Sequence, residues 1–307
     1  MVHRKPGALG ACVLMAASGM LGGASLLAMA AFLCIGSFDV FDPEWAWVSA
    51  LAWNGGMSLA FFLQHSGMIR GWVRLHLLSV VPDAFAGAVF SIASGSVLLA
   101  VLGLWQRVPP EIVTVQGSGR WALRVASALA LAGFVWGVHS LNRFDALGIR
   151  AIRAHRRGGK GREASGPLVA RGPYRWVRHP LYAFTLVLIW TCPDVTVDRL
   201  LFNVLWSGWI VLAVRLEERD LEALYGEEYR RYRRAVPMLI PRRIRHPMYT
   251  GFLLWILGWV LAHGAAVSLA PGVAGDASIL YWQRLEEAAV EKRFGDLYRT
   301  YRQATWF

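Results

Sequence analysis

The chain has 307 residues, of which 56% are hydrophobic and only 17% are charged, and its mean hydropathy is +0.40. Soluble domains carry roughly a quarter charged residues, so this composition excludes an ordinary soluble protein, a disordered chain and a collagen-like chain. The cysteines Cys12, Cys34 and Cys192 form no CxxC pair and no Cys/His cluster, so neither a disulfide scaffold nor a metal site is expected. The net charge of +12 comes from basic residues beside apolar segments, where membrane topology and anionic lipid explain it better than nucleic acid does.

Four long apolar segments precede residue 143. Residues 7–38 contain no charged side chain and are about twice as long as the apolar core of a secretory signal, which indicates an uncleaved spanning helix. Residues 45–64, 84–106 and 121–142 are each close to the roughly 20 residues that cross a bilayer core. We therefore predict an all-α, polytopic helical bundle whose first domain, residues 1–142, contains four spans.

The apolar segments after residue 180 are shorter. Residues 180–193 and 200–214 flank a charged tip that contains Asp194, Asp198 and Arg199, and we predict a hairpin that leans or only partly crosses the membrane. Residues 247–262 form a similar apolar arm. The segment 263–276 contains Gly and Pro, and we expect it to break the helix.

The basic residues of the loops predict the orientation of the chain. Between Asn142 and Pro180 there are ten Lys or Arg residues and only two acidic residues, and the positive-inside rule places such a loop in the cytoplasm. The N-terminus and the basic segment 215–245 then lie on the same side. We expect a bacterial inner-membrane protein with these segments in the cytoplasm.

The basic loop leads into an ordered set of motifs. GPYRWVRHPLY occupies residues 172–182, the apolar hairpin follows, and then come RLEERDL at 215–221 and YGEEYRRYRRAVPMLIP at 225–241. We take residues 143–241 as the second domain, with a cofactor pocket facing the cytoplasm.

The same pattern begins again 67 residues after Arg178. RHPMY stands at residues 245–249, RLEE returns at 284–287, and Tyr298 and Tyr301 follow FG at 294–295 as Tyr229 and Tyr232 follow YG at 225–226. The second copy lacks the preceding GPYR and the terminal VPMLIP. We interpret residues 242–307, the third domain, as a partly degenerate remnant in preference to a working site.

The first copy contains an anion-binding pattern and a pair of carboxylates. Arg178 and His179 precede Pro180, which suits the first turn of a helix, and the N–H groups of that turn together with Arg178 could hold a carboxylate or phosphate. At the other end of the hairpin, Glu217 and Glu218 could accept hydrogen bonds from an ammonium group or from ribose hydroxyls. Both features suit a zwitterionic ligand.

The third feature is a row of tyrosines. Tyr225, Tyr229 and Tyr232 have i, i+4, i+7 spacing, so we expect them on one helical face that could stack on a purine or surround a cation. With the anion site and the carboxylates, this face describes a pocket for a zwitterionic nucleoside such as S-adenosylmethionine. In the structural alternative, the same residues anchor the chain to lipid headgroups and form surface ion pairs. The fixed order of the motifs in two copies favours a ligand site.

The order GPYRxVRHPxY, apolar hairpin, EExxLxxxxGxxYxxYxxxVPxxIP resembles the catalytic half of the isoprenylcysteine carboxyl methyltransferase superfamily. QHSGMIR at 64–70 and FDALGIR at 144–150 resemble its nurim branch, and the bacterial methanethiol S-methyltransferases in particular. The resemblance implies methyl transfer from S-adenosylmethionine to a small hydrophobic thiol. It implies that the cofactor is bound by Tyr174, Arg178, His179, Pro180, Tyr182, Glu217, Glu218, Tyr229 and Tyr232. The chain departs from the pattern at Asn142 and Arg143, where an acidic residue and a His are expected, and residues 244–307 are extra.

Methyl transfer from a sulfonium depends on alignment and exclusion of water and needs no metal. A thiol acceptor must lose its proton, because the thiolate is the nucleophile. The candidates that could accept the proton or stabilise the charge are His179, His65 and Arg143. His65 lies near the end of its span and could instead reach water, whereas Asn54 is better explained by helix packing and His139 by reaching water.

Three other functions stay open. The chain could methylate a lipid-like or prenylcysteine-like carboxylate or an amine, and formation of dimethyl sulfide from methanethiol would separate this from thiol methylation. It could be a non-catalytic, nurim-like membrane protein. It could also be a nicotinamide-dependent reductase like the membrane sterol reductases. Titration with S-adenosylmethionine and with NADPH separates these last two from a methyltransferase.

Overall fold

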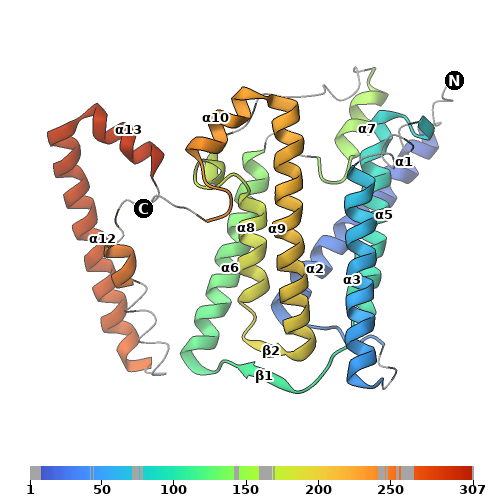
Figure 1. Cartoon of the computed structure of the whole chain (residues 1–307), viewed down its shortest axis with the longest axis horizontal. Helices are drawn as coiled ribbons and strands as arrows, with labels where there is room; N and C mark the ends of the chain where they lie inside the picture. Colours follow the sequence, from blue (N-terminus) through green and yellow to red (C-terminus); the bar gives the residue numbers. More distant parts are fainter. Residues whose placement is uncertain are drawn as a thin grey trace. The chain divides into compact units, whose positions relative to one another are not determined.

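A computed structural model describes residues 8–41, 43, 45–70, 76, 79–141, 145–158, 168, 170–240, 246, 248–253, 256 and 266–305 (Figure 1). These residues are helical almost throughout, apart from a two-stranded sheet of β1 (Glu111–Thr114) and β2 (Asp194–Thr196). The chain divides into two compact units that alternate along the sequence. The first comprises residues 1–113, 142–167 and 194–216, and the second comprises residues 114–141, 168–193 and 217–307. The prediction of an all-α, polytopic membrane protein is confirmed, and the motif-based division at residues 142 and 241 stays a prediction.

Within the described residues, four helical segments are long and apolar enough to cross a membrane. The first, Ala8–Ile35, consists of α1 (Ala8–Ala17), a π-helical turn η1 (Ser18–Gly22) and α2 (Gly23–Ile35). The others are α5 (Asp83–Gly103), α6 (Gly117–Ser140) and α9 (Val197–Tyr225). Helix α3 (Trp47–Ile69) has 23 residues and covers residues 47–64 of the predicted span at 45–64, but it is not one of these four segments.

Two sequence-based predictions are wrong. The apolar length of the arm at 200–214 predicts only a partial crossing, but α9 has 29 residues because the helix continues beyond the apolar run through the charged segment 215–221. The Gly and Pro residues of 263–276 predict a helix break, yet α12 (Ala266–Phe294) runs through Pro271. A proline in the second turn of a helix removes one hydrogen bond near its beginning, and the 23 residues that follow keep their own.

The FDALGIR motif orients a short helix in the first unit. Gly148 has a φ of +67° and precedes α7 (Ile149–Arg156), and a side chain there would collide with the backbone of Gly87 and Ala88 on α5. Asp145 Oδ2 accepts a hydrogen bond from the N–H of Ala151 at 3.0 Å. The motif therefore brings α7 against α5.

The charged tip between the hairpin arms is a buried anchor. Asp198 is 3% exposed and accepts hydrogen bonds from Trp105 Nε1 at 2.9 Å, Val108 N at 2.9 Å and Thr196 Oγ1 at 2.7 Å. Arg199, which is 2% exposed, donates to the last carbonyls of the first spanning segment, Phe32 O at 2.8 Å and Leu33 O at 2.9 Å. These two charges thus connect the beginning of α9 to two other segments of the first unit.

In the second unit, α6 and α8 (Pro180–Trp190) lie side by side (Figure 1). Small residues of α6 allow this close approach, because a side chain at Gly133 would collide with Phe184 and one at Gly137 with Leu181. Two short helices complete the motif region, η2 (Gly172–Arg175) before α8 and α10 (Glu227–Ala235) after α9. The packing of α8 on α6 fixes the position of α8, and therefore also the position of the RHPLY motif at its beginning.

We expect Asp198→Ala to lower the free energy of unfolding by about 3–5 kcal/mol, because three buried donors lose their acceptor. Thermal unfolding of the purified protein in detergent checks this. The control is Glu111→Gln, which removes an exposed carboxylate on β1 and should change the stability by less than about 0.5 kcal/mol. Equal stability of the two variants would show that the tip is not an anchor.

Candidate functional site

The RHPLY motif and the segment after α10 are joined through their backbones. Helix α8 begins at Pro180 and has His179 as its N-cap, as the sequence predicts, and no side chain caps its first turn. The N–H of Arg178 donates to Pro237 O at 2.8 Å, and the N–H of His179 donates to Met238 O at 3.1 Å. The VPMLIP segment therefore holds the Arg-His pair in place.

The side chain of Arg178 is buried and binds two other segments of the chain. Its Nε and Nη2 lie 2.7 and 2.6 Å from Glu218 Oε1, and the two side chains are only 8% and 12% exposed. Its Nη1 donates to Arg233 O at 3.0 Å and to Val236 O. The guanidinium thus uses most of its donors within the protein, and it connects α9 to the end of α10.

His179 lies between the two carboxylates. Its Nε2 is 3.3 Å from Glu218 Oε1 and its Nδ1 is 3.8 Å from Glu217 Oε2. Burial lowers the pKa of His179 below its ordinary value, and the two carboxylates oppose this shift in part. The imidazole is therefore neutral near pH 7. Its ring is also close to Tyr182, with 5.9 Å between the ring centroids.

Glu217 provides an acceptor for which the described residues supply no donor. Its side chain is 40% exposed, but the Oε2 atom is buried and accepts no hydrogen bond from any described residue. A buried carboxylate oxygen without a donor is costly, so a protein rarely keeps one without a reason. This oxygen faces the same imidazole that Glu218 contacts from the other side.

The tyrosines close one side of this cluster. The hydroxyl of Tyr232 donates to Tyr174 O at 2.6 Å, and Tyr229 is 1% exposed. Burial, with a smaller effect of Glu218, raises the pKa of Tyr229 to about 12, and burial also raises the pKa of Tyr174 and Tyr232. All three phenols are therefore neutral.

The expectation that Tyr225 shares a helical face with these tyrosines is wrong. Gly226 has φ and ψ of 56° and −125°, which ends α9 at Tyr225, whereas Tyr229 and Tyr232 belong to α10. A glycine within a helical pattern is the available signal for this break. Because of it, α10 can change direction and bring Tyr232 to the η2 turn.

All nine residues that the sequence suggests for cofactor binding belong to the second unit. They are linked by the contacts described above or are neighbours in the sequence. Of the other two catalytic candidates, Arg143 lies outside the described residues, and His65 belongs to the first unit. On α3 the ring of His65 lies between Phe61 and Phe90, at 5.1 Å from each centroid. Its Nδ1 is buried and has no hydrogen-bond partner among the described residues.

Asn54 has the packing role that the sequence predicts. Its Nδ2 donates to Gln106 O at 2.8 Å, and its Oδ1 accepts from Gln106 N at 2.9 Å. The amide therefore satisfies the backbone that follows α5, and it is not available as a ligand. His139 is exposed, and its Nδ1 contacts Val135 O of the preceding helical turn at 2.9 Å.

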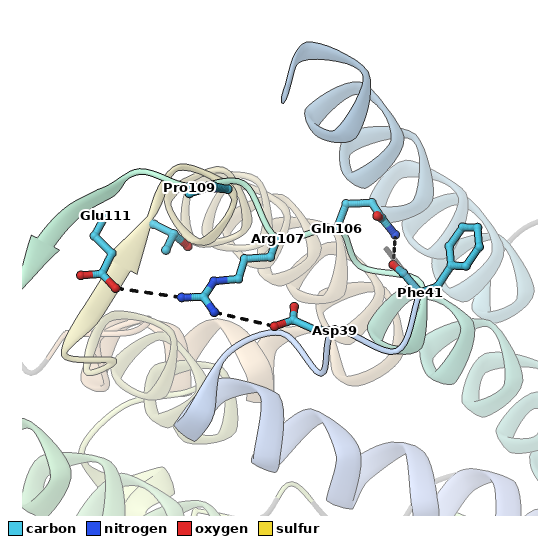
Figure 2. Close-up of a pocket in the computed structure, with 7 residues that line it drawn as sticks. Asp39, Phe41, Gln106, Arg107, Pro109 and Glu111 are labelled. Atoms are coloured by element: carbon cyan, nitrogen blue, oxygen red, sulfur yellow. Dashed lines mark hydrogen bonds and ion pairs between the residues drawn. The ribbon is translucent and has the colours of Figure 1, made fainter. Parts of the chain in front are cut away.

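The first unit contains a cavity of about 430 Å³ that no sequence motif indicates (Figure 2). Its lining comes from three separate segments: Asp39, Phe41, Gln106, Arg107, Pro109, Glu111 and Thr196. In Figure 2 the guanidinium of Arg107 points between Asp39 and Glu111, at 3.7 and 4.0 Å. All three side chains are about half exposed, so these long ion pairs contribute little to stability.

Among the described residues, no His, Cys, Asp or Glu side chains form a group that could hold a metal ion.

Comparison with known proteins shows that the chain is related to the nurim-like membrane proteins. The chain is 34% identical to methanethiol S-methyltransferase of Mycobacterium tuberculosis over 61% of this chain and 76% of that protein. It is 33% identical to methanethiol S-methyltransferase 2 of Bradyrhizobium diazoefficiens over 61% and 71%, and 25% identical to nurim of Sus scrofa over 62% and 78%. The chain therefore belongs to the methanethiol S-methyltransferase family, in the nurim branch of the isoprenylcysteine carboxyl methyltransferase superfamily. No family model and no solved structure matches it.

The lowered pKa of His179 predicts how stability depends on pH. The folded chain binds this proton less readily than the unfolded chain, so the stability that the neutral imidazole contributes is present above the ordinary pKa of about 6.5 and is lost as the pH falls below it. One such group contributes at most about 1.4 kcal/mol per pH unit. Unfolding in detergent at pH 7.5 and 5.5 should therefore show a weaker pH dependence for His179→Gln than for the parent chain. The exposed His139→Gln should keep the parent dependence, and an unchanged dependence in His179→Gln would contradict the assignment.

Proposed function

We propose that the chain is an S-adenosylmethionine-dependent methyltransferase that converts methanethiol, or a similar small thiol, to its methyl thioether, which for methanethiol is dimethyl sulfide. Membership of the methanethiol S-methyltransferase family supports the reaction class. The observation that carries the proposal is the buried Oε2 of Glu217, which accepts no hydrogen bond from the described residues and faces His179. It has the chemistry required to accept a hydrogen bond from a cationic ligand.

The residues of the cluster fit the methyl donor. S-adenosylmethionine has an ammonium group and two ribose hydroxyls that donate hydrogen bonds, and Glu217 Oε2 is placed to accept one of them. Its carboxylate would be held by the uncapped first turn of α8. Arg178 is engaged by Glu218 and by backbone carbonyls, so we assign it a positioning role: it fixes Glu218, which in turn orients His179.

When bound, the donor supplies a methyl group on a sulfonium, which a thiolate takes by in-line displacement. The new bond joins the thiolate sulfur to the methyl carbon, and the electron pair of the broken carbon–sulfur bond stays with the former sulfonium sulfur. The protein's part is to align the two sulfur atoms with the methyl group and to exclude water. Neutral phenols are suited to this role, because Tyr229 and Tyr232 add apolar surface beside the carboxylates without adding charge.

The acceptor thiol must lose a proton, and we assign this proton to His179. The contact of Nε2 with Glu218 Oε1 favours the tautomer in which Nε2 carries the hydrogen, so Nδ1 has a free electron pair. The lowered pKa keeps the imidazole neutral and able to accept a proton near pH 7. From Nδ1 the proton would pass to water.

The positive-inside rule supports a cytoplasmic position for the basic loops, and hence for the RHPLY and EE motifs, in a bacterial inner membrane. The methyl donor would then reach the cluster from the cytoplasm. A small, uncharged thiol such as methanethiol would reach it through the bilayer, where it dissolves readily.

The test is the release of dimethyl sulfide from membranes supplied with methanethiol and S-adenosylmethionine, measured in the headspace by gas chromatography. We expect activity for the parent chain and a 10- to 100-fold lower kcat/KM for Glu217→Gln, because a charge-assisted hydrogen bond contributes roughly 1.5–3 kcal/mol. The matched control is Glu228→Gln, an exposed carboxylate on α10, which should keep the parent value. No dimethyl sulfide from the parent chain, or equal activity of Glu217→Gln and Glu228→Gln, would contradict the proposal.

A further inference from the structure

The C-terminal repeat has the same helical plan as the first copy. Helix α12 has 29 residues and is followed by α13 (Asp296–Ala304) with 9, as α9 with 29 residues is followed by α10 with 9. All four boundaries are displaced by 69 residues. The connecting glycines have the same backbone conformation, with φ and ψ of 56° and −125° at Gly226 and 49° and −124° at Gly295.

The ion pairs that hold the short helix are repeated as well. In the first copy, Arg230 Nε donates to Glu222 Oε1 at 2.8 Å, and in the second copy Arg299 Nε donates to Glu291 Oε1 at 2.8 Å. These carboxylates lie in the last turn or two of the long helices. Both copies therefore fix the direction of the short helix in the same way.

The central contact of the candidate site is present in both copies. His246 Nε2 lies 3.0 Å from Glu287 Oε1, and these side chains are 12% and 18% exposed. The counterpart in the first copy is the 3.3 Å contact between His179 and Glu218. A tyrosine of the short helix is also buried in the second copy, since Tyr298 is 7% exposed.

The second copy differs at the other carboxylate. Glu286, the counterpart of Glu217, accepts a hydrogen bond from the hydroxyl of Tyr249 at 2.8 Å through its Oε2. A ligand would have to displace this hydroxyl. The chain also has no GPYR turn before the second RHP, and Arg245 lies outside the described residues.

We propose that His246, Glu286, Glu287 and Tyr298 of the C-terminal repeat form a second binding site for the same class of ligand, an adenosine-linked zwitterion such as the methyl donor or its demethylated product. This inference rests on the proposed function of the first copy. The partly buried contact between His246 and Glu287 repeats the contact that orients His179 in the first copy, so the second copy keeps a positioned imidazole beside its carboxylates. The second copy also has Glu286 at the position of Glu217, the carboxylate that binds the ligand in our proposal for the first copy. Competition from Tyr249 makes the second site the weaker of the two.

The experiment measures how many equivalents of S-adenosylhomocysteine, which cannot be turned over, the detergent-solubilised full chain binds by calorimetric titration. We expect two equivalents with different affinities for the parent chain. Glu287→Gln should abolish the weaker one and Glu218→Gln the tighter one. The matched control is Asp296→Asn, whose carboxylate is 95% exposed on α13 and which should keep two equivalents.

The outcomes separate this inference from the proposed function. A single equivalent that Glu218→Gln removes and Glu287→Gln leaves intact would overturn the second site and retain the first. Two equivalents in Glu287→Gln would also overturn it. No binding by the parent chain would refute the proposed function, and the inference with it. If Glu287→Gln does not fold, as judged by its thermal unfolding, His246→Gln replaces it, and the same loss of the weaker equivalent is required.

Discussion

The buried ion pair between Arg178 and Glu218 is the interaction on which the rest of the candidate site depends. It joins the beginning of α8, the end of α9 and the end of α10, which are brought together from three separate stretches of sequence. Breaking a buried pair leaves an uncompensated charge, which costs about 3–5 kcal/mol. The pair therefore fixes the geometry around His179 and leaves Glu217 as the carboxylate that can meet a ligand. We therefore propose that Glu218 is structural and that its neighbour Glu217 binds the ligand.

Much of this site could be predicted from the sequence, because each motif has its own local signal. Pro180 marks the beginning of α8, and the order of RHPLY, EE and the tyrosines selects the residues that gather. The different roles of Glu217 and Glu218 could not be predicted, because they depend on which of the two carboxylates pairs with the guanidinium of Arg178. Gly226 is the local signal for the break between α9 and α10, but the tyrosine spacing fits a continuous helix equally well.

In the fold, too, local sequence patterns predict some features, whereas others depend on tertiary contacts. Apolar length predicts the first spanning segment, α5 and α6, but it fails for α9, because a helix can extend into water beyond its apolar run. Asp198 and Arg199 belong to the charged tip between the two arms of the predicted hairpin. Asp198 and Arg199 are nevertheless buried, because backbone groups and an indole at the ends of other segments supply their hydrogen-bond partners. Such partners come from distant parts of the chain, and no local pattern reveals them.

We propose that Arg178 acts through Glu218 and not by contacting the ligand itself. A double-mutant cycle with Arg178→Met and Glu218→Gln, measured as the dissociation constant of S-adenosylhomocysteine for the tighter site, tests this most directly. We expect strong non-additivity, with the double variant binding no more weakly than the worse single variant. Additive losses would contradict it, because they would show that the two side chains contribute to ligand binding independently.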